Sequence, residues 1–248
     1  MSEHNKRETM QERRDFLKAG AVMAGATAAS GVLVYSVAHS RAPEEGASAS
    51  KRWGMLIDTS KCGDGCNDCV TACNTENGLS GETGPQDSQY IRKLNIKDLR
   101  NGRVHELPML CQHCEHPPCV DVCPTGASMR RADGIVLVDR HICIGCRYCM
   151  MACPYKARSF VHEPLTDQNP EVPRGKGCVE SCTFCVQRVD RDEQPACVEA
   201  CNAKGHQAMV FGDLKDPESA IAKALKSQAS TEVRADLGLN TGVRYQGI

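Results

Sequence analysis

The stretch Cys143-Ile-Gly-Cys146-Arg-Tyr-Cys149-Met-Met-Ala-Cys153-Pro154 decides how the rest of the chain is interpreted. Its cysteines have the spacing C-x2-C-x2-C-x3-C and a proline follows, a pattern typical of loops that hold [4Fe-4S] clusters. In that pattern the first three thiolates bind one cubane and the fourth binds a second one. One such run therefore predicts two clusters, whose remaining ligands must come from other parts of the sequence.

Three further runs repeat this arrangement of three leading cysteines and a last one after three residues. They are Cys62-x3-Cys66-x2-Cys69-x3-Cys73, Cys111-x2-Cys114-x4-Cys119-x3-Cys123-Pro124 and Cys182-x2-Cys185-x11-Cys197-x3-Cys201. Sixteen of the 17 cysteines belong to this fourfold repeat, which leaves only Cys178. Internal repetition of this kind is a stronger indication of architecture than any local propensity.

The composition agrees with an interior that side chains alone do not fill. Four phenylalanines, five tyrosines and one tryptophan are few for a chain of 248 residues, because large aromatics usually supply much of the buried area. Inorganic clusters would occupy that space, and folding would then depend on them. The formal net charge is −1, so no basic excess indicates a nucleic-acid partner.

Tetrahedral zinc sites are the main alternative, because C-x2-C pairs also bind Zn²⁺. Zinc ligands usually come as separated pairs, whereas triplets with a distant fourth cysteine recur four times here, so the pattern favours iron-sulfur clusters. Disulfides are disfavoured because closely spaced cysteines cannot pair among themselves without strain. The sequence contains no C-x-x-C-H motif, which excludes c-type haem attachment.

A few other residues near the runs have a possible role at the clusters. His113 and His116 lie among the cysteines of the second run, where we expect hydrogen-bond donors around the ligands rather than ligands. Cys178 is expected to be a free thiol, with replacement of Cys182 as a ligand the alternative. Arg188 and Arg191 near the fourth run are expected to be solvated surface residues, with electrostatic tuning of a cluster as the alternative.

Residues 1–38 have the features of a twin-arginine export signal. The charged stretch Arg13–Lys18 precedes residues 19–38, which carry no charge and are rich in alanine, glycine and valine. Ser36–Ala38 is a small-x-small cleavage site, Ser40–Ala42 also fits, and a retained membrane anchor is the alternative to export. Residues 39–50 are expected to be a flexible linker.

Hydrophobic runs, turn residues and prolines predict short elements between the cysteine loops. Strands are expected at residues 53–58, at 102–110 ending at Pro108, in a 128–139 hairpin, at 158–161 and at 207–211. Helices are expected at residues 70–76 and 217–225, and Pro117-Pro118 is expected to delay a helix until Cys119. Residues 164–177 are expected to form a loop, and the polar tail 213–248 to lie on the outside or against a partner.

With these motifs the chain resembles the four-cluster electron-transfer subunits of the NrfC and PsrB type and the B subunits of molybdopterin oxidoreductases. The match covers about residues 53–245, including Cys111-Gln-His-Cys114 with Pro117-Pro118-Cys119, and Cys182-Thr-Phe-Cys185 with Arg188. The twin-arginine leader and the Cys62-Gly-Asp-Gly-Cys66 opening look most like DsrO-type periplasmic subunits. The resemblance implies an α+β fold of tandem bacterial-ferredoxin-like modules around four [4Fe-4S] clusters.

The resemblance also implies that neighbouring runs exchange their last ligands. The implied sets are Cys62, Cys66, Cys69 and Cys201; Cys182, Cys185, Cys197 and Cys73; Cys111, Cys114, Cys119 and Cys153; and Cys143, Cys146, Cys149 and Cys123. Residues 51–110 and 164–212 would then form an outer half with two clusters, into which residues 111–163 are inserted as a second half with two clusters.

A periplasmic electron relay is the function that the resemblance implies. Such a subunit carries single electrons between a quinone-interacting membrane subunit of the NrfD or DsrP type and the other redox subunits of a DsrMKJOP-type complex in dissimilatory sulfur metabolism. It is attached to the membrane through these partners. The alternative is the B subunit of a periplasmic molybdopterin oxidoreductase of the polysulfide, thiosulfate or DMSO reductase type.

The sequence contains no general acid/base set, nucleophile elbow or phosphate loop, so we predict no catalytic residues. Two further hypotheses remain open. The chain could reduce a small substrate at an incompletely ligated cluster, or its clusters could be purely structural.

Overall fold

The computed structural model describes residues 47–63, 65–79, 84, 86–100, 102–166 and 168–248. The predicted export signal and all but the last four residues of the predicted linker lie outside the described residues. None of the helices in the described part of the chain has both the length and the apolar character required to cross a bilayer.

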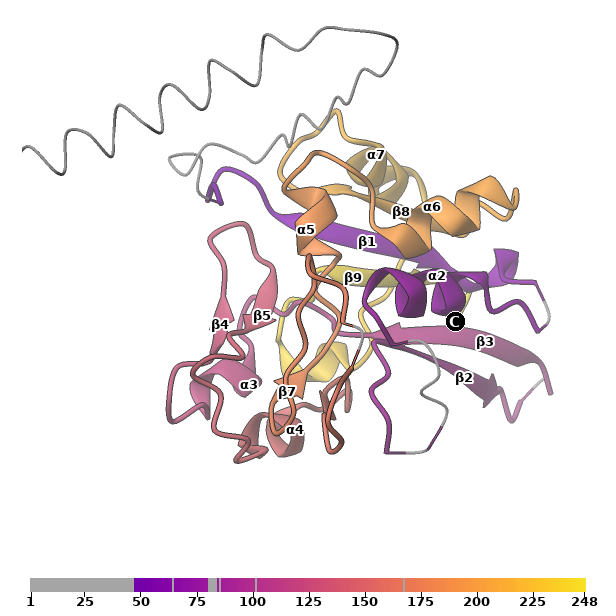
Figure 1. Cartoon of the computed structure of the whole chain (residues 1–248). Helices are drawn as coiled ribbons and strands as arrows, with labels where there is room; N and C mark the ends of the chain where they lie inside the picture. Colours follow the sequence, from indigo (N-terminus) through magenta and orange to yellow (C-terminus); the bar gives the residue numbers. More distant parts are fainter. Residues whose placement is uncertain (1–46, 64, 80–83, 85, 101, 167) are drawn as a thin grey trace, which may run out of the picture. The chain divides into compact units, whose positions relative to one another are not determined.

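A three-stranded sheet with the order β8-β1-β9 holds the two ends of the described chain together (Figure 1). The central strand β1 (Trp53–Asp58) spans the predicted residues and is buried from Met55 onward. It pairs antiparallel with β8 (Met209–Asp213), which lies two residues later than predicted. The sheet thus joins the segment before the first cysteine run to the segment after the last one.

The C-terminal tail is part of this core, contrary to the expectation that it lies outside. Strand β9 (Val243–Gln246) pairs in parallel with β1, and Val243 and Tyr245 are fully buried. The Tyr245 hydroxyl donates to the carbonyl oxygen of Pro108 at 3.0 Å. The alternating apolar residues of this strand cover one face while its backbone satisfies the free edge of β1.

Helix α7 (Ala220–Ser227), which precedes this strand, packs on β8 and β1. It begins three residues later than expected because Ser219 caps it, with its hydroxyl accepting the N–H of Ala222 at 3.2 Å.

A second antiparallel pair is formed by β2 (Ile91–Lys97) and β3 (Val104–Leu110). Strand β2 was not predicted, because Arg, Lys and Asn interrupt its apolar pattern and four of its residues are exposed. Strand β3 continues two residues beyond the predicted end at Pro108. A strand with one partner has a free edge, where a proline removes no ladder hydrogen bond.

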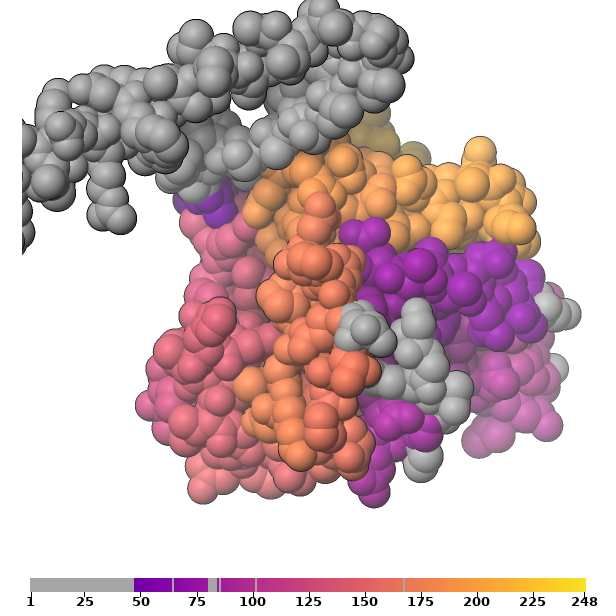
Figure 2. All heavy atoms as spheres, in the orientation of Figure 1, coloured from indigo at the N-terminus to yellow at the C-terminus, as the bar shows by residue number. Residues whose placement is uncertain are grey.

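Short helices carry the cysteines and pack in two pairs. Helix α2 (Asp68–Glu76) packs on α6 (Ala196–Ala203), and Figure 2 shows their surfaces in contact. Helix α5 (Val186–Val189) precedes α6. Helix α3 (Pro118–Asp121) packs on α4 (Tyr148–Ala152).

Helix α3 begins at Pro118, one residue earlier than predicted. Proline is tolerated at the first helical position, where its missing N–H would have no intrahelical partner.

The predicted hairpin is present, with strands β4 (Ser128–Arg130) and β5 (Val136–Val138). Strand β6 (Ser159–Phe160) lies within the predicted residues 158–161 and pairs with β7 (Val179–Glu180). Between these two strands, the described residues of 164–177 form no helix or strand, as expected. Mixed short helices and strands around cysteine loops define an α+β fold of the ferredoxin-like kind.

Candidate metal centres

Three hollows in the structure are each lined by four cysteines, and four further cysteines are buried and influence one another electrostatically. We call the four groups the first to fourth quartets, in the order in which their earliest cysteine occurs. They are Cys62, Cys66, Cys69 and Cys201; Cys73, Cys182, Cys185 and Cys197; Cys111, Cys114, Cys119 and Cys153; and Cys123, Cys143, Cys146 and Cys149. Each group combines cysteines from two runs.

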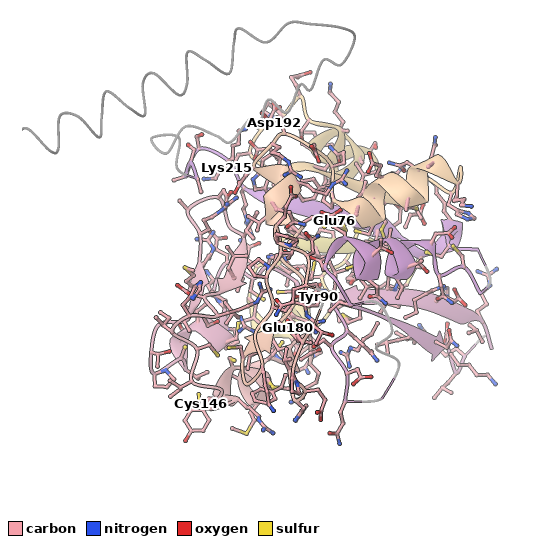
Figure 3. All side chains as sticks on the ribbon, viewed as in Figure 1. Glu76, Tyr90, Cys146, Glu180, Asp192 and Lys215 are labelled. Atoms are coloured by element: carbon pink, nitrogen blue, oxygen red, sulfur yellow. The ribbon has the colours of Figure 1, made fainter. Side chains whose placement is uncertain are left out.

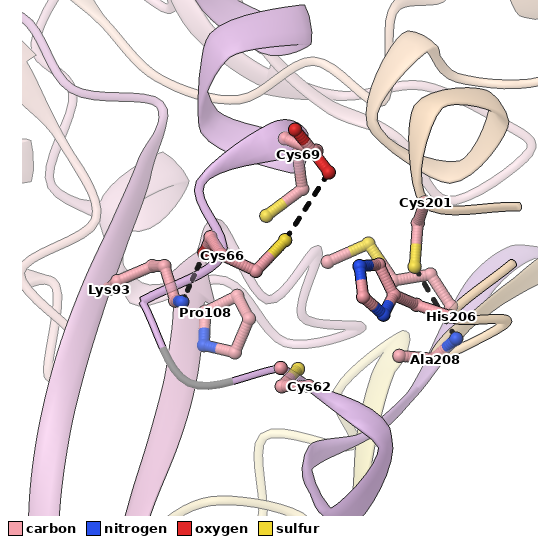
Figure 4. A pocket seen from close by; sticks show the side chains of 11 residues that line it. Cys62, Cys66, Cys69, Lys93, Pro108, Cys201, His206 and Ala208 are labelled. Atoms are coloured by element: carbon pink, nitrogen blue, oxygen red, sulfur yellow. Dashed lines mark hydrogen bonds between the residues drawn. The ribbon is translucent and has the colours of Figure 1, made fainter. Parts of the chain in front are cut away.

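The first quartet surrounds a hollow between α2, α6 and the β2–β3 pair. Figure 4 shows its cysteines approaching the hollow from separate segments, with Lys93, Pro108 and His206 completing the wall. Cys66, Asp68 and His206 also bring ligand atoms within 4.8 Å of one another. These three residues line the same hollow. The three other cysteines of the quartet supply thiolate ligands there, which are softer than the Asp68 carboxylate and the His206 imidazole.

The second quartet is identified by burial and mutual electrostatic influence. Burial raises the pKa of Cys73 well above its ordinary value, and the thiolates of Cys197 and Cys185 raise it further. Burial also raises the pKa of Cys182 well above its ordinary value, and the Cys73 thiolate raises it further. The Asn77 amide lies 3.6 Å from the Cys73 sulfur and donates a weak hydrogen bond to it.

The third quartet lines a hollow formed by residues of the segment 111–158, with Val136, Tyr155 and Arg158 among them. Burial raises the pKa of Cys111 to about 12. The fourth quartet lines the remaining hollow together with Ile144 and Val179. It contains Cys146, the only one of the 17 cysteines that is exposed.

A shared backbone feature relates the four runs beyond their spacing. The residue directly before the second cysteine has a positive φ in every run: Gly65 at 72°, His113 at 43°, Gly145 at 70° and Phe184 at 54°. Backbone in this region is strained for a residue other than glycine and persists only where the surroundings impose it. The repetition indicates one loop geometry that wraps the backbone around each quartet.

The donor set fits [4Fe-4S] clusters. Burial raises the pKa of several of these thiols, among them Cys73, Cys111 and Cys182, and cationic iron would stabilise their thiolate forms. Buried donors also point to an acceptor that protein atoms do not supply. His113 Nε2 and the Nε and Nη1 atoms of Arg158 have no hydrogen-bond partner among the described residues. Cluster sulfides and thiolates accept such hydrogen bonds.

The two histidines of the second run differ. His113 is buried and stacks on Phe184 with ring centroids 3.6 Å apart. Its Nδ1 accepts the N–H of Val136 at 3.0 Å, and burial together with the Arg158 charge lowers its pKa to about 3. A neutral His113 therefore carries its proton on Nε2, which is a donor rather than a ligand. His116 lines none of the three hollows.

Cys178 lies apart from the second quartet. It is buried, and its thiol donates to the carbonyl oxygen of Arg140 at 3.3 Å. Burial raises its pKa, and Cys143 of the fourth quartet adds to the effect. It therefore neighbours the fourth quartet rather than replacing Cys182.

We expect a C178S variant to retain the full iron content and an unchanged redox titration. Serine keeps a hydroxyl donor for the Arg140 carbonyl oxygen, so the cost in stability should be about 1 kcal/mol. Iron analysis and denaturant unfolding measure both quantities. Loss of about four irons in C178S would show that Cys178 is a ligand.

Two basic residues beside the quartets were not singled out in the sequence. Lys93, on the unpredicted strand β2, contacts the carbonyl oxygen of Cys66 and forms an ion pair with Glu106. Arg158 lies five residues after Cys153, the last cysteine of its run. At the same distance from the last cysteine, the second run has Ser128 and the fourth run has His206. The backbone N–H of Ser128 also donates to a cysteine sulfur, at 3.3 Å, but the residue type at this position differs between the runs, so the sequence repeat gave no signal for Arg158.

Arg188 was expected to be a solvated surface residue, but its side chain is only 18% exposed and forms ion pairs with Glu76 and Glu199. Arg191 likewise pairs with Glu171 and Glu193.

A ferredoxin-like α+β fold in which buried cysteines gather in fours defines an iron-sulfur electron-transfer protein. Comparison with known proteins gives the same class: residues 103–214 match the model of the 4Fe-4S dicluster domain. The chain belongs to the family of [4Fe-4S] electron-transfer subunits of oxidoreductase complexes.

Three relatives support this assignment. The Hdr-like menaquinol oxidoreductase iron-sulfur subunit 1 of Archaeoglobus fulgidus is 41% identical over 95% of this chain and 98% of its own. The tetrathionate reductase B subunit of Salmonella typhimurium is 39% identical over 79% of this chain and 73% of its own. Protein NrfC of Escherichia coli is 36% identical over 91% of both chains.

Proposed function

We propose that the chain binds four [4Fe-4S] clusters, one in each quartet, and relays single electrons through them as a DsrO-like subunit. The observation that carries the proposal is the grouping of sixteen cysteines into four quartets, each drawn from two runs. We assign all sixteen as iron ligands: Cys62, Cys66, Cys69, Cys201, Cys73, Cys182, Cys185, Cys197, Cys111, Cys114, Cys119, Cys153, Cys123, Cys143, Cys146 and Cys149.

Electrostatic effects between cysteines and one contact between aromatic rings support an arrangement in which each quartet neighbours the next, from the first to the fourth. Burial raises the pKa of Cys197, and Cys69 of the first quartet adds to this effect on the second. The stacked rings of Phe184 and His113 connect the loops of the second and third quartets. Burial and then Cys153 raise the pKa of Cys119 in the third quartet, with a further contribution from Cys149 in the fourth.

The exposure of the cysteines supports the first and the fourth quartet as the two ends of this series. Cys62 and Cys66 of the first quartet are half-buried and Cys146 of the fourth is exposed, while every cysteine of the second and third quartets is buried. Figure 3 labels Cys146 at the lower left edge of the molecule in this view, to the left of α4. A redox partner can therefore approach the first or the fourth quartet, but not the middle pair.

Each bound cluster supplies a one-electron carrier whose potential depends on its charge, burial and hydrogen bonds. The polypeptide holds the ligands rigidly through the α2–α6 and α3–α4 pairs. It also keeps water from the second and third quartets, whose cysteines are all buried. We infer that residues 51–110 with 164–212, and residues 111–163, act as the outer and inserted electron-carrying halves.

We infer partners and location from the relatives and from the N-terminal sequence. One relative is named as part of a menaquinol oxidoreductase, which supports a quinol-linked membrane subunit of the NrfD or DsrP type as a partner. The twin-arginine motif at residues 13–14 supports export of the folded, cluster-containing protein to the periplasm. The other partners would be redox subunits of a DsrMKJOP-type complex in sulfur metabolism.

The second candidate is the B subunit of a periplasmic molybdopterin oxidoreductase of the polysulfide, thiosulfate or DMSO reductase type. The 39% identity to the tetrathionate reductase B subunit favours it. Purification of the native complex in detergent separates the two candidates. A molybdopterin-containing partner would support the second, and a quinol-oxidising complex without molybdenum would support the first.

Iron analysis and EPR-monitored redox titration of the full chain test the proposal. We expect about sixteen irons per chain and four titrating components, because each quartet would hold four irons. A value of about eight would mean that two quartets are not cluster sites. Clusters that stay in one oxidation state at accessible potentials would instead indicate a structural role.

A further inference from the structure

Arg158 is buried between the third and fourth quartets. Its side chain is only 5% exposed and helps to line the hollow of the third quartet. Its Nη2 donates to the sulfur of Cys119, a member of the third quartet, at 3.1 Å. The same guanidinium interacts electrostatically with Cys149 of the fourth quartet.

No carboxylate neutralises this cation in the described part of the chain. The ion pairs there do not include Arg158, and its Nε and Nη1 atoms have no hydrogen-bond partner among the described residues. The buried Arg174, in contrast, pairs with Glu180 at 2.6 Å. Removing an isolated positive charge from water is costly unless anionic groups surround it. The sulfur atoms of the third and fourth quartets lie beside the guanidinium and would supply the compensating negative charge.

The outer half has no equivalent residue among its described basic side chains near cysteines. Lys93, beside the first quartet, is paired with Glu106. Arg188, beside the second quartet, is paired with Glu76 and Glu199. A cation already paired with a carboxylate adds little net field at a neighbouring cluster.

We propose that Arg158 is a positioning residue that raises the reduction potentials of the clusters in both the third and the fourth quartet. The inference rests on the proposed function, because it requires clusters in these quartets. A cluster gains one negative charge when it accepts an electron, and an unpaired cation in a low-dielectric interior stabilises that state. One side chain would thus set two adjacent potentials together and make the inserted half the more readily reduced part of the chain.

The test is an EPR-monitored redox titration of the full, cluster-containing chain with R158Q. Glutamine keeps a hydrogen-bond donor of similar reach but removes the charge. We expect two of the four titrating components to shift to lower potential and the other two to stay in place. The control is K156Q, which removes a positive charge two residues earlier from an exposed side chain, where solvent screens it.

Unchanged potentials in an R158Q protein with wild-type iron content would overturn the inference, as would an equal shift in K156Q. If R158Q binds less iron than wild type, the R158K variant tests the inference instead. Lysine retains the charge, so we expect wild-type iron content and potentials close to wild type, whereas loss of iron in R158K as well would overturn the inference. A wild-type chain without four redox-active components would contradict the proposed function instead.

Discussion

Replacing Cys73 together with Cys69 should remove two clusters, whereas replacing Cys73 together with Cys182 should remove only one. Cys73 lies on α2 in the first run, but after burial the thiolates of Cys197 and Cys185 in the fourth run raise its pKa more than Cys69 of its own run does. Cys69, one helical turn earlier, lines the hollow of the first quartet. The iron content should therefore fall from about sixteen to about eight in C69S/C73S and to about twelve in C73S/C182S.

The control is C73S/C178S, which removes the same number of thiols but only one proposed ligand. It should lose about four irons, as C73S does alone. If each run held its own cluster, the expected iron losses would be reversed. C69S/C73S would then lose fewer irons than C73S/C182S. Equal iron loss in the two test variants would also contradict the exchange of ligands.

Removing the iron under anaerobic, reducing conditions should abolish cooperative unfolding. The quartets occupy the space between the paired helices, and the aromatic residues available to fill it are few. Without iron, the thiols lose the interaction that brings four distant segments together, and binding free energy of this kind is folding free energy. We expect a broad, non-cooperative denaturant response from the iron-free chain and a cooperative one from the loaded protein.

Trp53 reports this change because it is the only tryptophan. Its ring stacks on Phe211 at 5.3 Å, and its Nε1 donates to Asp133 at 3.1 Å. These contacts join β1, β8 and the hairpin turn of the inserted half, so their loss should move the emission maximum to longer wavelength. Readdition of iron and sulfide should reverse the shift. An iron-free chain that stays compact with unshifted emission would contradict the role of the clusters in the fold.

The predicted elements succeeded where the pattern was local. Strand β1 and the β4–β5 hairpin follow from short apolar runs and a turn at residues 132–134. Strand β2 was missed because its basic and polar residues hide the alternation, and β9 was missed because the tail is polar overall. Both strands exist because another strand edge needs backbone partners, which is a tertiary requirement.

By itself, the sequence determined the chemistry of this protein. The number, spacing and repetition of its cysteines specify soft thiolate ligands in sets, and these are local properties of the chain. Only the tertiary structure decided which distant cysteines meet, which quartets water can reach, and that Arg158 lies unpaired by any described carboxylate between two of them. Those outcomes depend on contacts between segments far apart in sequence, such as α2 with α6, and on the burial that these contacts create.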